Sequence, residues 1–355
     1  ILFLFNRNMR NFFILLFTLC FVMCAPRQSD NTISVDLDHA EKASLFDYFR
    51  SIELIPLETS SDALVQALTK VVEHDDKYYA LDKPQCLIFV FDKAGKFLYK
   101  IGTKGQGAGE YAFISDFNIN PFSGNLEILE PYGRIHVYSL LGDFIETKRI
   151  SYPEFKVAHS LAALDNDIYV SHSLFEPKKI AYFDLNKQEL LHEEFEEDMA
   201  IGSYSQIPYQ YKDEWFFYRP FHPIVYKIGK KHLEAFFKFD FGKYTKDGRT
   251  AVLSQEAKMN FTKNIEEMYA QYSYMIQAVR HNDKYILASV LWKDNDHRAN
   301  IIYDKSTGKS KYIIEFDEKV WFNSYRGEEI IVTDQYAMMP IQWVDLEKQI
   351  GRAHV

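Results

Sequence analysis

The feature of the sequence that most constrains its fold is a unit that recurs along most of the chain. Each copy runs strand, polar turn, strand, longer loop, strand, polar turn and strand. The second strands of the copies are the easiest to identify: Tyr78–Leu81, Leu126–Leu129, Ile168–Val170, Trp215–Tyr218, Tyr285–Ala288 and Glu329–Val332. The copies follow one another at roughly 45 residues, and this period with four strands per copy is typical of propeller blades.

The repeat predicts an all-β fold, a six-bladed β-propeller of four-stranded antiparallel blades. One such sheet buries too little apolar surface to persist alone, whereas sheets stacked radially bury both faces. Ser51–Leu57 (SIELIPL) has no hairpin partner, so we expect it to close the ring as the outer strand of the last blade. The longer interval Lys243–Tyr272 contains helical spacing over Thr250–Tyr269, which predicts a partly helical insert between blades four and five.

The N-terminal segment is typical of an export signal. Phe12–Met23 is an apolar run without a charge, short for a transmembrane helix but suited to the core of a signal peptide. Cys24 follows directly, which predicts a lipidated cysteine; an ordinary signal peptide and an uncleaved anchor are the alternatives. The predicted divisions of the chain are upstream read-through and signal peptide (1–24), a linker (25–45), the propeller, which a C-terminal truncation would shorten (46–349), and a non-native tail (350–355).

Two motifs resemble a known family. Ser51–Thr59 (SIELIPLET) and Ile101–Tyr111 (IGTKGQGAGEY), the latter followed by Asp116-Phe117, closely resemble the six-bladed β-propeller lipoproteins of Gram-negative bacteria. That family is related to NHL-repeat and TolB-like propellers, and Ala108 stands where it usually has proline. The resemblance covers most of the chain after residue 45. It implies a propeller fold and export; a role as an accessory to glycan uptake is a weaker implication.

Charge and cysteine usage exclude two classes of protein. The formal net charge of -9 gives the chain no electrostatic basis for binding nucleic acid through its phosphates. Of the three cysteines, Cys20 lies in the apolar run and Cys24 is the expected anchor. Cys86 is then left alone in an apolar strand, so we expect it to be a buried small hydrophobe and the mature monomer to lack an intramolecular disulfide.

Loop lengths single out one end of the predicted blades. Second-to-third loops and blade-to-blade links share that end, and they are longer and chemically richer than the turns at the other end. Because function concentrates on loops held by a rigid scaffold, this loop-rich face is the predicted binding surface. The candidate ligand-binding residues are Gly105, Gln106, Gly107, Gly109, Glu110, Tyr111, Tyr132, Arg134, His172, Arg219, His222, Trp292 and Tyr336.

Each candidate group has a second reading. The glycines at 105–109 lead into Glu110-Tyr111 and a strand instead of a helix, so they favour a backbone turn over a phosphate-binding loop. The aromatic candidates either stack on sugar rings or pack between blades. His172, His222 and His297 occupy corresponding loops and could converge on a metal, but no short ligand spacing supports this. Exposed loop histidines are the favoured reading, and no metal or cofactor is expected.

The predicted function is that of a non-catalytic binding module, lipid-anchored at the outer membrane on its periplasmic or surface side. Its partner would be a glycan or a protein, it would contact the membrane through the anchor only, and it would be a monomer. A hydrolase or lyase with a metal-assisted site at the channel mouth is the alternative, because propeller sites gather single residues from separate blades. Convergence of these loop residues would favour that enzyme: Asp82, Glu110, Glu130, His172, His222, Asp294 and Asp334.

Overall fold

The computed structural model describes residues 31–51, 53–150, 158–173, 178–196, 208–246, 251–272, 274–292, 297–317 and 331–338. The residues from Thr32 onward form one compact unit. No helix among the described residues has the length and apolar character needed to cross a membrane. The prediction of a signal peptide and of lipidation at Cys24 lies outside the described residues.

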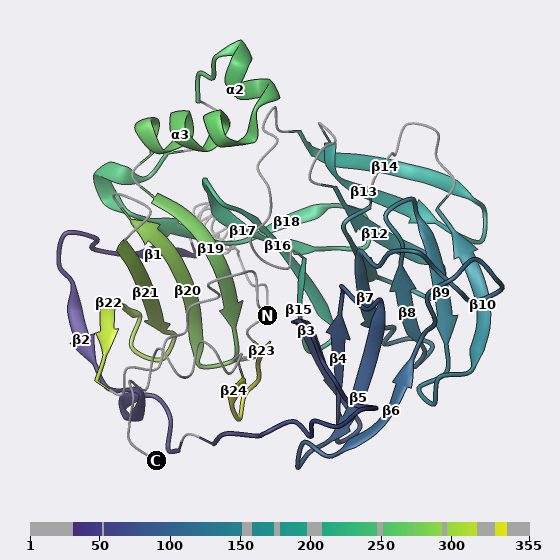
Figure 1. Ribbon diagram of the computed structural model, residues 1–355. Helices are drawn as coiled ribbons and strands as arrows, with labels where there is room; N and C mark the ends of the chain where they lie inside the picture. The colour runs from purple at the N-terminus through teal and green to yellow at the C-terminus, as the bar shows by residue number, and fades with distance from the viewer. Residues whose placement is uncertain are drawn as a thin grey trace, which may run out of the picture. The chain divides into compact units, whose positions relative to one another are not determined.

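Five four-stranded antiparallel sheets form the blades of a β-propeller (Figure 1). The first two blades are β3 (Leu68–His74), β4 (Lys77–Asp82), β5 (Leu87–Asp92) and β6 (Phe97–Ile101), then β7 (Asp116–Ile119), β8 (Leu126–Leu129), β9 (Arg134–Tyr138) and β10 (Phe144–Arg149). The third is β11 (Ser160–Ala163), β12 (Ile168–His172), β13 (Lys178–Asp184) and β14 (Glu189–Glu196). The last two are β15 (Tyr209–Tyr211), β16 (Glu214–Arg219), β17 (His222–Ile228) and β18 (Leu233–Asp240), then β19 (Tyr274–His281), β20 (Tyr285–Trp292), β21 (His297–Asp304) and β22 (Lys309–Phe316).

The prediction of six blades was wrong. Where a sixth sheet was expected, the described residues form a two-stranded hairpin of β23 (Ile331–Val332) and β24 (Ala337–Met338). This hairpin contacts β19 of the fifth blade, and Met338 packs against the apolar cluster of the first blade. The error arose because two short apolar runs were taken as evidence of a whole blade, although such runs alone do not establish a four-stranded sheet.

The predicted closure by Ser51–Leu57 was also wrong. No described residue of this segment is in a strand; Ile55 and Leu57 instead pack against the first blade. Pro56 has no amide hydrogen to donate to a strand ladder, and its carbonyl approaches Gly95, which has a φ of 81°. The N-terminal strands that do join blades are β1 (Thr32–Ser34), parallel to β18, and β2 (Glu41–Ala43), parallel to β22.

The helical spacing in the insert corresponds to two helices between β18 and β19, α2 (Gln255–Met259) and α3 (Phe261–Gln271). Ser254 and Asn260 cap them, since each side chain accepts a hydrogen bond from a backbone N–H of the first turn. The insert packs on an apolar cluster that includes Phe221 and Met275 of blades four and five. Short 3-10 turns are formed by η1 (Leu45–Asp47) and η2 (Gly242–Tyr244).

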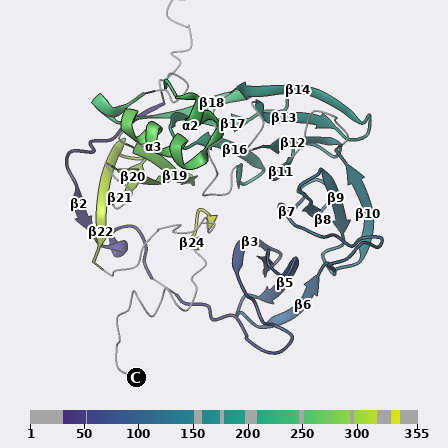
Figure 2. The same cartoon turned by 45° about the horizontal axis from the view of Figure 1, so that its top comes forward.

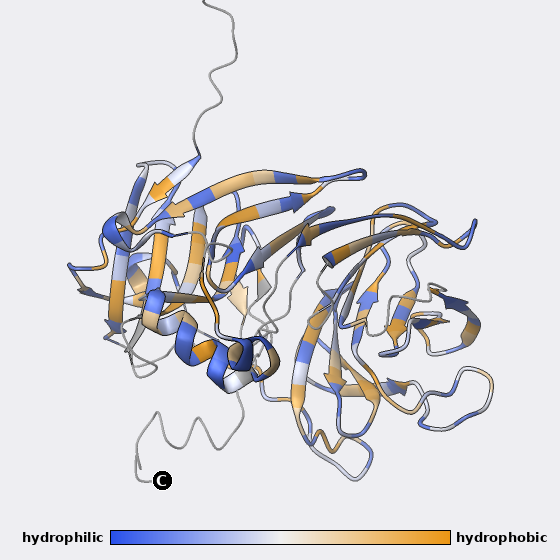
Figure 3. Ribbon diagram, turned by 90° about the horizontal axis from the view of Figure 1, so that it is seen from above, coloured by the Kyte–Doolittle hydropathy of each residue, from blue (hydrophilic) through white to orange (hydrophobic). Residues whose placement is uncertain are grey.

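The core lies between the blades. Figure 3 shows most hydrophobic stretches in the strands, with hydrophilic residues interleaved. The fourth-blade residues Phe216 and Phe217 are fully buried, whereas β10, an outer strand, is largely exposed. In Figure 2, β6, β10 and β14 lie at the outer edges of their blades, with β3, β7 and β11 toward the inside. Polar side chains at the ends of the inner strands therefore come from different blades and lie near one another.

Candidate functional site

The register of the blades places two kinds of loop at the same end. Leu68 at the start of β3 pairs with Asp82 at the end of β4, and Ser160 at the start of β11 pairs with His172 at the end of β12. Blade-to-blade links and second-to-third loops therefore meet at one end, which we call the loop-rich face. The first-to-second turns lie at the opposite end, which we call the turn face.

The glycine motif on the loop-rich face is a self-contained turn. One carboxylate oxygen of Glu110 accepts hydrogen bonds from the backbone N–H groups of Gln106 (2.9 Å) and Gly107 (2.8 Å). The Gly105 N–H donates to the carbonyl of Tyr111 at 3.1 Å, and the Tyr111 ring is completely buried. Burial raises the pKa of the Tyr111 phenol, which is therefore neutral. Glu110 and Tyr111 thus organise the loop from within.

The same turn explains why Gly109 is required there. Its φ of 74° favours glycine, and a Cβ at this position would lie 2.6 Å from the ring of Phe144. The Tyr138 hydroxyl donates a hydrogen bond to the Gly109 carbonyl, so the second blade fixes the loop. The backbone-turn reading of the motif accounts for these contacts.

Among the described residues of the loop-rich face, Tyr132 and Phe113 have exposed aromatic rings. Tyr132, between β8 and β9, is 77% exposed, and Phe113, in the link before β7, is 63% exposed. Their loops are joined because the Ala112 N–H donates to a Glu130 carboxylate oxygen at 3.2 Å. Arg134 forms an ion pair with Glu130, which holds its guanidinium beside the two loops that carry Tyr132 and Phe113. Of the predicted aromatic residues, Tyr132 therefore presents a ring to solvent.

The expectation of exposed loop histidines was wrong for His172 and His222. Both are almost fully buried, as is Arg219, whose Nη1 lies 3.5 Å from His172 Nε2. The ring of His222 stacks on that of Tyr226, with 5.7 Å between centroids. These three residues lie between blades three and four, where burial of their rings and stems adds to packing. The side chains of Trp292 and His297 lie outside the described residues.

The predicted loop acids do not assemble a metal site with these histidines in the part of the chain that the structure describes. Asp82 accepts hydrogen bonds from the backbone of Gln66 (2.5 Å) and from Gln85, and Glu130 is held by Arg134 and Ala112. Asp294 lies outside the described residues. Glu110 holds its own loop, whereas Asp82, Glu130 and Asp334 each hold a neighbouring segment.

Tyr336 and Asp334 lie on the turn face, not on the loop-rich face where the sequence placed them. Asp334 Oδ1 accepts hydrogen bonds from the Tyr211 hydroxyl (2.6 Å) and the Asp283 N–H (2.9 Å). Tyr211 is the last residue of β15 and Asp283 lies in the β19–β20 turn, so both are at the turn face. The Tyr336 N–H donates to Thr333 Oγ1 at 3.1 Å within the β23–β24 turn. The repeat predicted Glu329–Val332 as the second strand of a blade, whereas the turn after β23 lies where first-to-second turns lie.

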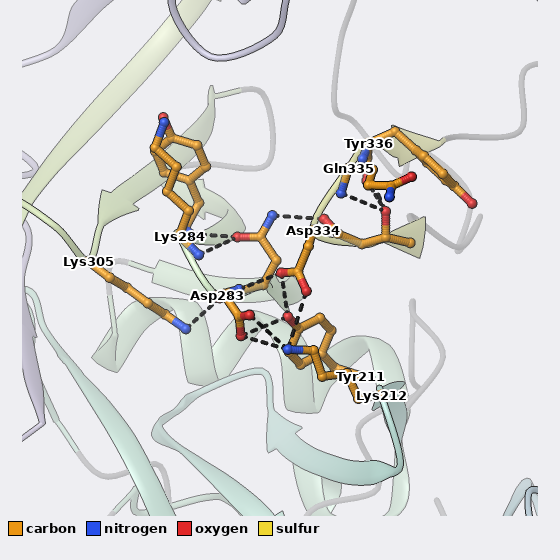
Figure 4. Close-up of polar contacts among 11 residues, drawn as sticks. Tyr211, Lys212, Asp283, Lys284, Lys305, Asp334, Gln335 and Tyr336 are labelled. Atoms are coloured by element: carbon orange, nitrogen blue, oxygen red, sulfur yellow. Dashed lines mark hydrogen bonds and ion pairs between the residues drawn. The ribbon is translucent and has the colours of Figure 1, made fainter.

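Figure 4 shows the resulting polar network on the turn face. Lys212 Nζ lies 2.8 Å from an Asp283 carboxylate oxygen and 3.3 Å from Asp334 Oδ2. Hydrogen bonding, chiefly to Asp283, raises the pKa of Lys212. Hydrogen bonds from the Tyr211 hydroxyl and the Asp283 N–H lower the pKa of Asp334 to about 2. Lys212 pairs with both carboxylates, so the network ties the hairpin to blades four and five.

A different polar group lies at the loop-rich ends of the inner strands. Lys70 Nζ of β3 donates hydrogen bonds to Asp116 Oδ1 (2.9 Å) and Asn118 Oδ1 (2.8 Å), both on β7. Asp116 Oδ2 in turn accepts from the N–H of Leu161 on β11, at 3.3 Å. The Lys70 and Asp116 side chains are 5% and 10% exposed. This buried ion pair links the first three blades.

Three further basic side chains extend from that pair: Lys83 interacts with Asp116 and Lys70, and His159 interacts with Lys83 and Lys179. We call these three residues and Lys70 the basic cluster. Burial, followed by the positive charges of Lys83 and Lys179, lowers the pKa of His159 to about 4, so its imidazole is neutral at pH 7. Lys179 is almost fully buried, on the third strand of the same blade. Positive charges from blades one and three therefore act on the same space.

Lys83 is the accessible member of the basic cluster. The residue is exposed, yet burial lowers the pKa of its ammonium; the charge of Asp116 opposes this shift, and the smaller effect of Lys70 adds to it. The Lys83 side chain is therefore in contact with solvent but partly enclosed by protein. Within the described residues, the Lys83 ammonium makes no hydrogen bond or ion pair. It is thus positioned to meet a negatively charged group from solution.

Sequence reasoning missed most of this cluster. The loop Asp82-Lys83-Pro84 was among the rich loops, but Lys83 was not selected from it. Lys70, His159 and Lys179 lie in or beside strands that carry no local motif. The available signal was a lysine interrupting a buried strand, as in β3, where Lys70 precedes two valines.

Comparisons with known proteins identify a family and a protein of similar fold. The chain matches the family described as a domain of unknown function, DUF4934, over residues 30–346. A Bacteroides fragilis protein named as an exported protein has a similar structure, with a TM-score of 0.69, 18% identity, and coverage of 91% of this chain and 92% of that one. A Bacteroides vulgatus member of the DUF4221 family gives a TM-score of 0.49, 12% identity, and coverage of 72% and 83%. Among curated proteins, no significant match is found.

Proposed function

We propose that this chain, which belongs to the DUF4934 family, is a non-catalytic binding module whose loop-rich face binds an acidic glycan. The observation that carries the proposal is the Lys83 ammonium, accessible and partly enclosed within the basic cluster. The whole chain has a formal net charge of -9, so the positive charge of the basic cluster is opposite in sign to the charge of the protein as a whole. Such local fields attract ligands of opposite charge.

The neighbouring aromatic rings favour a sugar over a small inorganic anion. Phe113 and Tyr132 are exposed on the same face as Lys83 and belong to loops joined through Glu130. An aromatic face is apolar and accepts C–H contacts from a sugar ring, while a lysine or arginine pairs with its carboxylate or sulfate. Arg134 stands beside Tyr132 and could add a second charged contact.

We place this activity in the cell envelope, with the chain held by lipid on Cys24. The apolar run Phe12–Met23 ahead of that cysteine supports export and anchoring. The name of the Bacteroides fragilis protein with a similar fold supports the same location. Mass spectrometry of the membrane fraction should find the lipid on Cys24, and a Cys24→Ala variant should leave that fraction.

Binding to an oligosaccharide array tests the proposed function. The array should hold uronate-containing and sulfated oligosaccharides beside neutral counterparts, including oligogalacturonate and its methyl ester. We expect an acidic member to be retained and its neutral counterpart not. Isothermal titration with that member should show a loss of about tenfold or more for Lys83→Met, since a hydrogen bond to a charged group contributes roughly 1.5–3 kcal/mol.

Lys96→Met is the matched control. Lys96 is an exposed lysine of the same blade, in the β5–β6 turn at the opposite end. Its loss should leave the affinity unchanged, whereas an equal loss in both variants would reveal non-specific attraction. Retention of neutral and acidic oligosaccharides alike would overturn the proposal.

A further inference from the structure

A second cluster of ligating side chains lies at the outer edge of the propeller, away from the basic cluster. His192 and Glu194 are both on β14, the outer strand of the third blade, and His232 lies in the β17–β18 turn of the fourth. Residues two apart in a strand project from the same face, so the sequence His-Glu-Glu directs His192 and Glu194 to one side. One ligand atom from each of the three residues lies within 4.8 Å of the other two.

The carboxylate of Glu194 is at the centre of this cluster. Its Oε1 lies 2.7 Å from His232 Nδ1 and 3.3 Å from His192 Nε2. Its Oε2 accepts a hydrogen bond from the backbone N–H of Leu233 at 2.7 Å. That second bond comes from the neighbouring blade and fixes the carboxylate, so that Oε1 faces both imidazoles.

His192 is held in place and is incompletely satisfied. Its ring stacks on that of Tyr182, with 4.2 Å between centroids and an interplanar angle of 15°. Its Nε2 is buried and makes no hydrogen bond within the part of the chain that the structure describes. A buried polar atom that lacks a hydrogen bond destabilises the fold unless something else satisfies it. Nε2 lies on the side of the ring that faces Glu194 Oε1.

We propose that His192, Glu194 and His232 bind a zinc ion that connects blades three and four. Two imidazole nitrogens and a carboxylate oxygen suit zinc, whereas magnesium and calcium prefer oxygen ligands. With zinc–ligand bonds of about 2.1 Å, neighbouring ligands of a tetrahedral ion lie about 3.4 Å apart. The His192–Glu194 separation of 3.3 Å already meets this, and the 2.7 Å between His232 Nδ1 and Glu194 Oε1 must lengthen by less than 1 Å. The ligand atoms of the two histidines lie within 4.8 Å, and the exposed turn of His232 can adjust that separation.

Three protein ligands leave one coordination position of the ion for water. His232 is exposed while His192 and Glu194 are half-buried, so that position opens toward solvent. The ion would join β14 of the third blade to the β17–β18 hairpin of the fourth. Glu194 already bridges these two elements, through His232 and the Leu233 N–H. Zinc is therefore expected to stabilise the propeller.

Zinc titration of the protein carrying no histidine tag tests this inference. After treatment with a chelator, isothermal titration should show saturable binding of one Zn²⁺ per chain, and the melting temperature should rise with Zn²⁺ but not with Mg²⁺, because a ligand of the folded state stabilises it. Co²⁺ in the same site should give visible absorption bands typical of nitrogen and oxygen coordination. His232→Asn should weaken Zn²⁺ binding at least tenfold and abolish the Co²⁺ bands.

His39→Asn is the matched control. His39 Nδ1 also lies 2.7 Å from a carboxylate, that of Asp36, but no third potential ligand joins this pair among the described residues. The variant should leave Zn²⁺ affinity and the Co²⁺ spectrum unchanged. Should His192→Asn fail to fold, the exposed His232 still provides the test. Absence of saturable binding, or equal binding by the His232 variant and the wild type, would overturn the inference. Neither outcome bears on glycan binding.

Discussion

The two ends of the blades arrange charge in opposite ways. On the turn face, Lys212 lies between the carboxylates of Asp283 and Asp334, and their interactions raise the pKa of the lysine and lower those of the acids. On the loop-rich face, burial lowers the pKa of Lys83 and of His159, and the charges of Lys83 and Lys179 lower that of His159 further. In the first region Lys212 and the two carboxylates favour one another's charged states; in the second, burial disfavours the charged state.

The direction of these pKa shifts separates a structural network from a candidate binding site. A network of matched charges is complete without a ligand and holds its elements together. A positive charge that burial disfavours is stabilised when an opposite charge arrives, which is the condition for binding. The loop-rich face therefore has a charge that a ligand could stabilise, whereas the charges of the turn face already stabilise one another. Each prediction below tests one side of that contrast.

The largest effect is expected from Asp116→Ala, which breaks the buried ion pair of the loop-rich face. Lys70 would keep its charge with only 5% of its side chain exposed and would lose its carboxylate partner. Removing one partner of a buried pair lowers the free energy of unfolding by about 3–5 kcal/mol. Urea denaturation at pH 7 measures this loss.

The double variant Lys70→Met with Asp116→Leu is the control. With both charges removed, most of the lost stability should return, because no uncompensated charge remains. A loss below about 1 kcal/mol for the single variant would mean that solvent screens the pair. The basic cluster would then be less enclosed than its burial indicates.

A smaller effect should appear as pH dependence through His159. Its folded pKa is about 4 and its reference value is 6.5. Between these values the unfolded chain binds a proton that the folded chain does not, so stability falls as pH drops from 6.5 to 4. For His159 alone the change at pH 5 is on the order of 1–2 kcal/mol.

His159→Gln isolates that contribution from those of other buried histidines such as His281, whose pKa burial lowers to about 3. Urea denaturation at pH 7 and pH 5 should show a smaller difference between the two pH values for the variant than for the wild type. Equal differences would mean that His159 titrates alike in both states, and that Lys83 and Lys179 do not act on it.

On the turn face, Asp334→Asn should lower the free energy of unfolding by less than about 1 kcal/mol, since its network is exposed. The pKa of Asp334 is lowered from 3.8 to about 2, so its contribution is present above pH 3.8 and is lost as pH falls toward 2. Thermal unfolding at pH 7 and pH 2 tests this: the variant should be less stable than the wild type at pH 7 and similar to it at pH 2. A difference that persists at pH 2 would assign the loss to packing.

The repeat predicted the propeller architecture but not the number of blades. Alternation and turn residues identify strands, and five copies form complete sheets. Closure depends on which distant segments meet, and a pattern of local residues does not encode that. Ser51–Leu57 has the alternation of a strand, yet Pro56 and its approach to Gly95 place it along the first blade, while β1 and β2 provide the added strands.

The candidate site was harder to predict because its residues come from separate blades. The Gly105–Tyr111 motif attracted interest by its composition, and its polar groups satisfy one another. Lys70, Lys83, His159 and Lys179 have no common spacing, and only the fold brings them together. His172 and Arg219, predicted to lie in loops, end the strands β12 and β16, and their burial depends on packing between blades that a local pattern does not reveal.

The smallest effect, and the most direct test of the contrast, is on stability when one lysine is removed from each end. Lys83→Met removes a charge that burial disfavours, so the free energy of unfolding should stay unchanged or rise slightly. The pKa of His159 should rise toward 6.5, because one of the charges that lower it is gone. Lys212→Met removes a charge that Asp283 and Asp334 favour and should destabilise the chain slightly. Urea denaturation of both variants and an NMR titration of the histidines measure these effects. If Lys83→Met is the more destabilising of the two, the ammonium has a structural partner and the loop-rich face is as complete as the turn face.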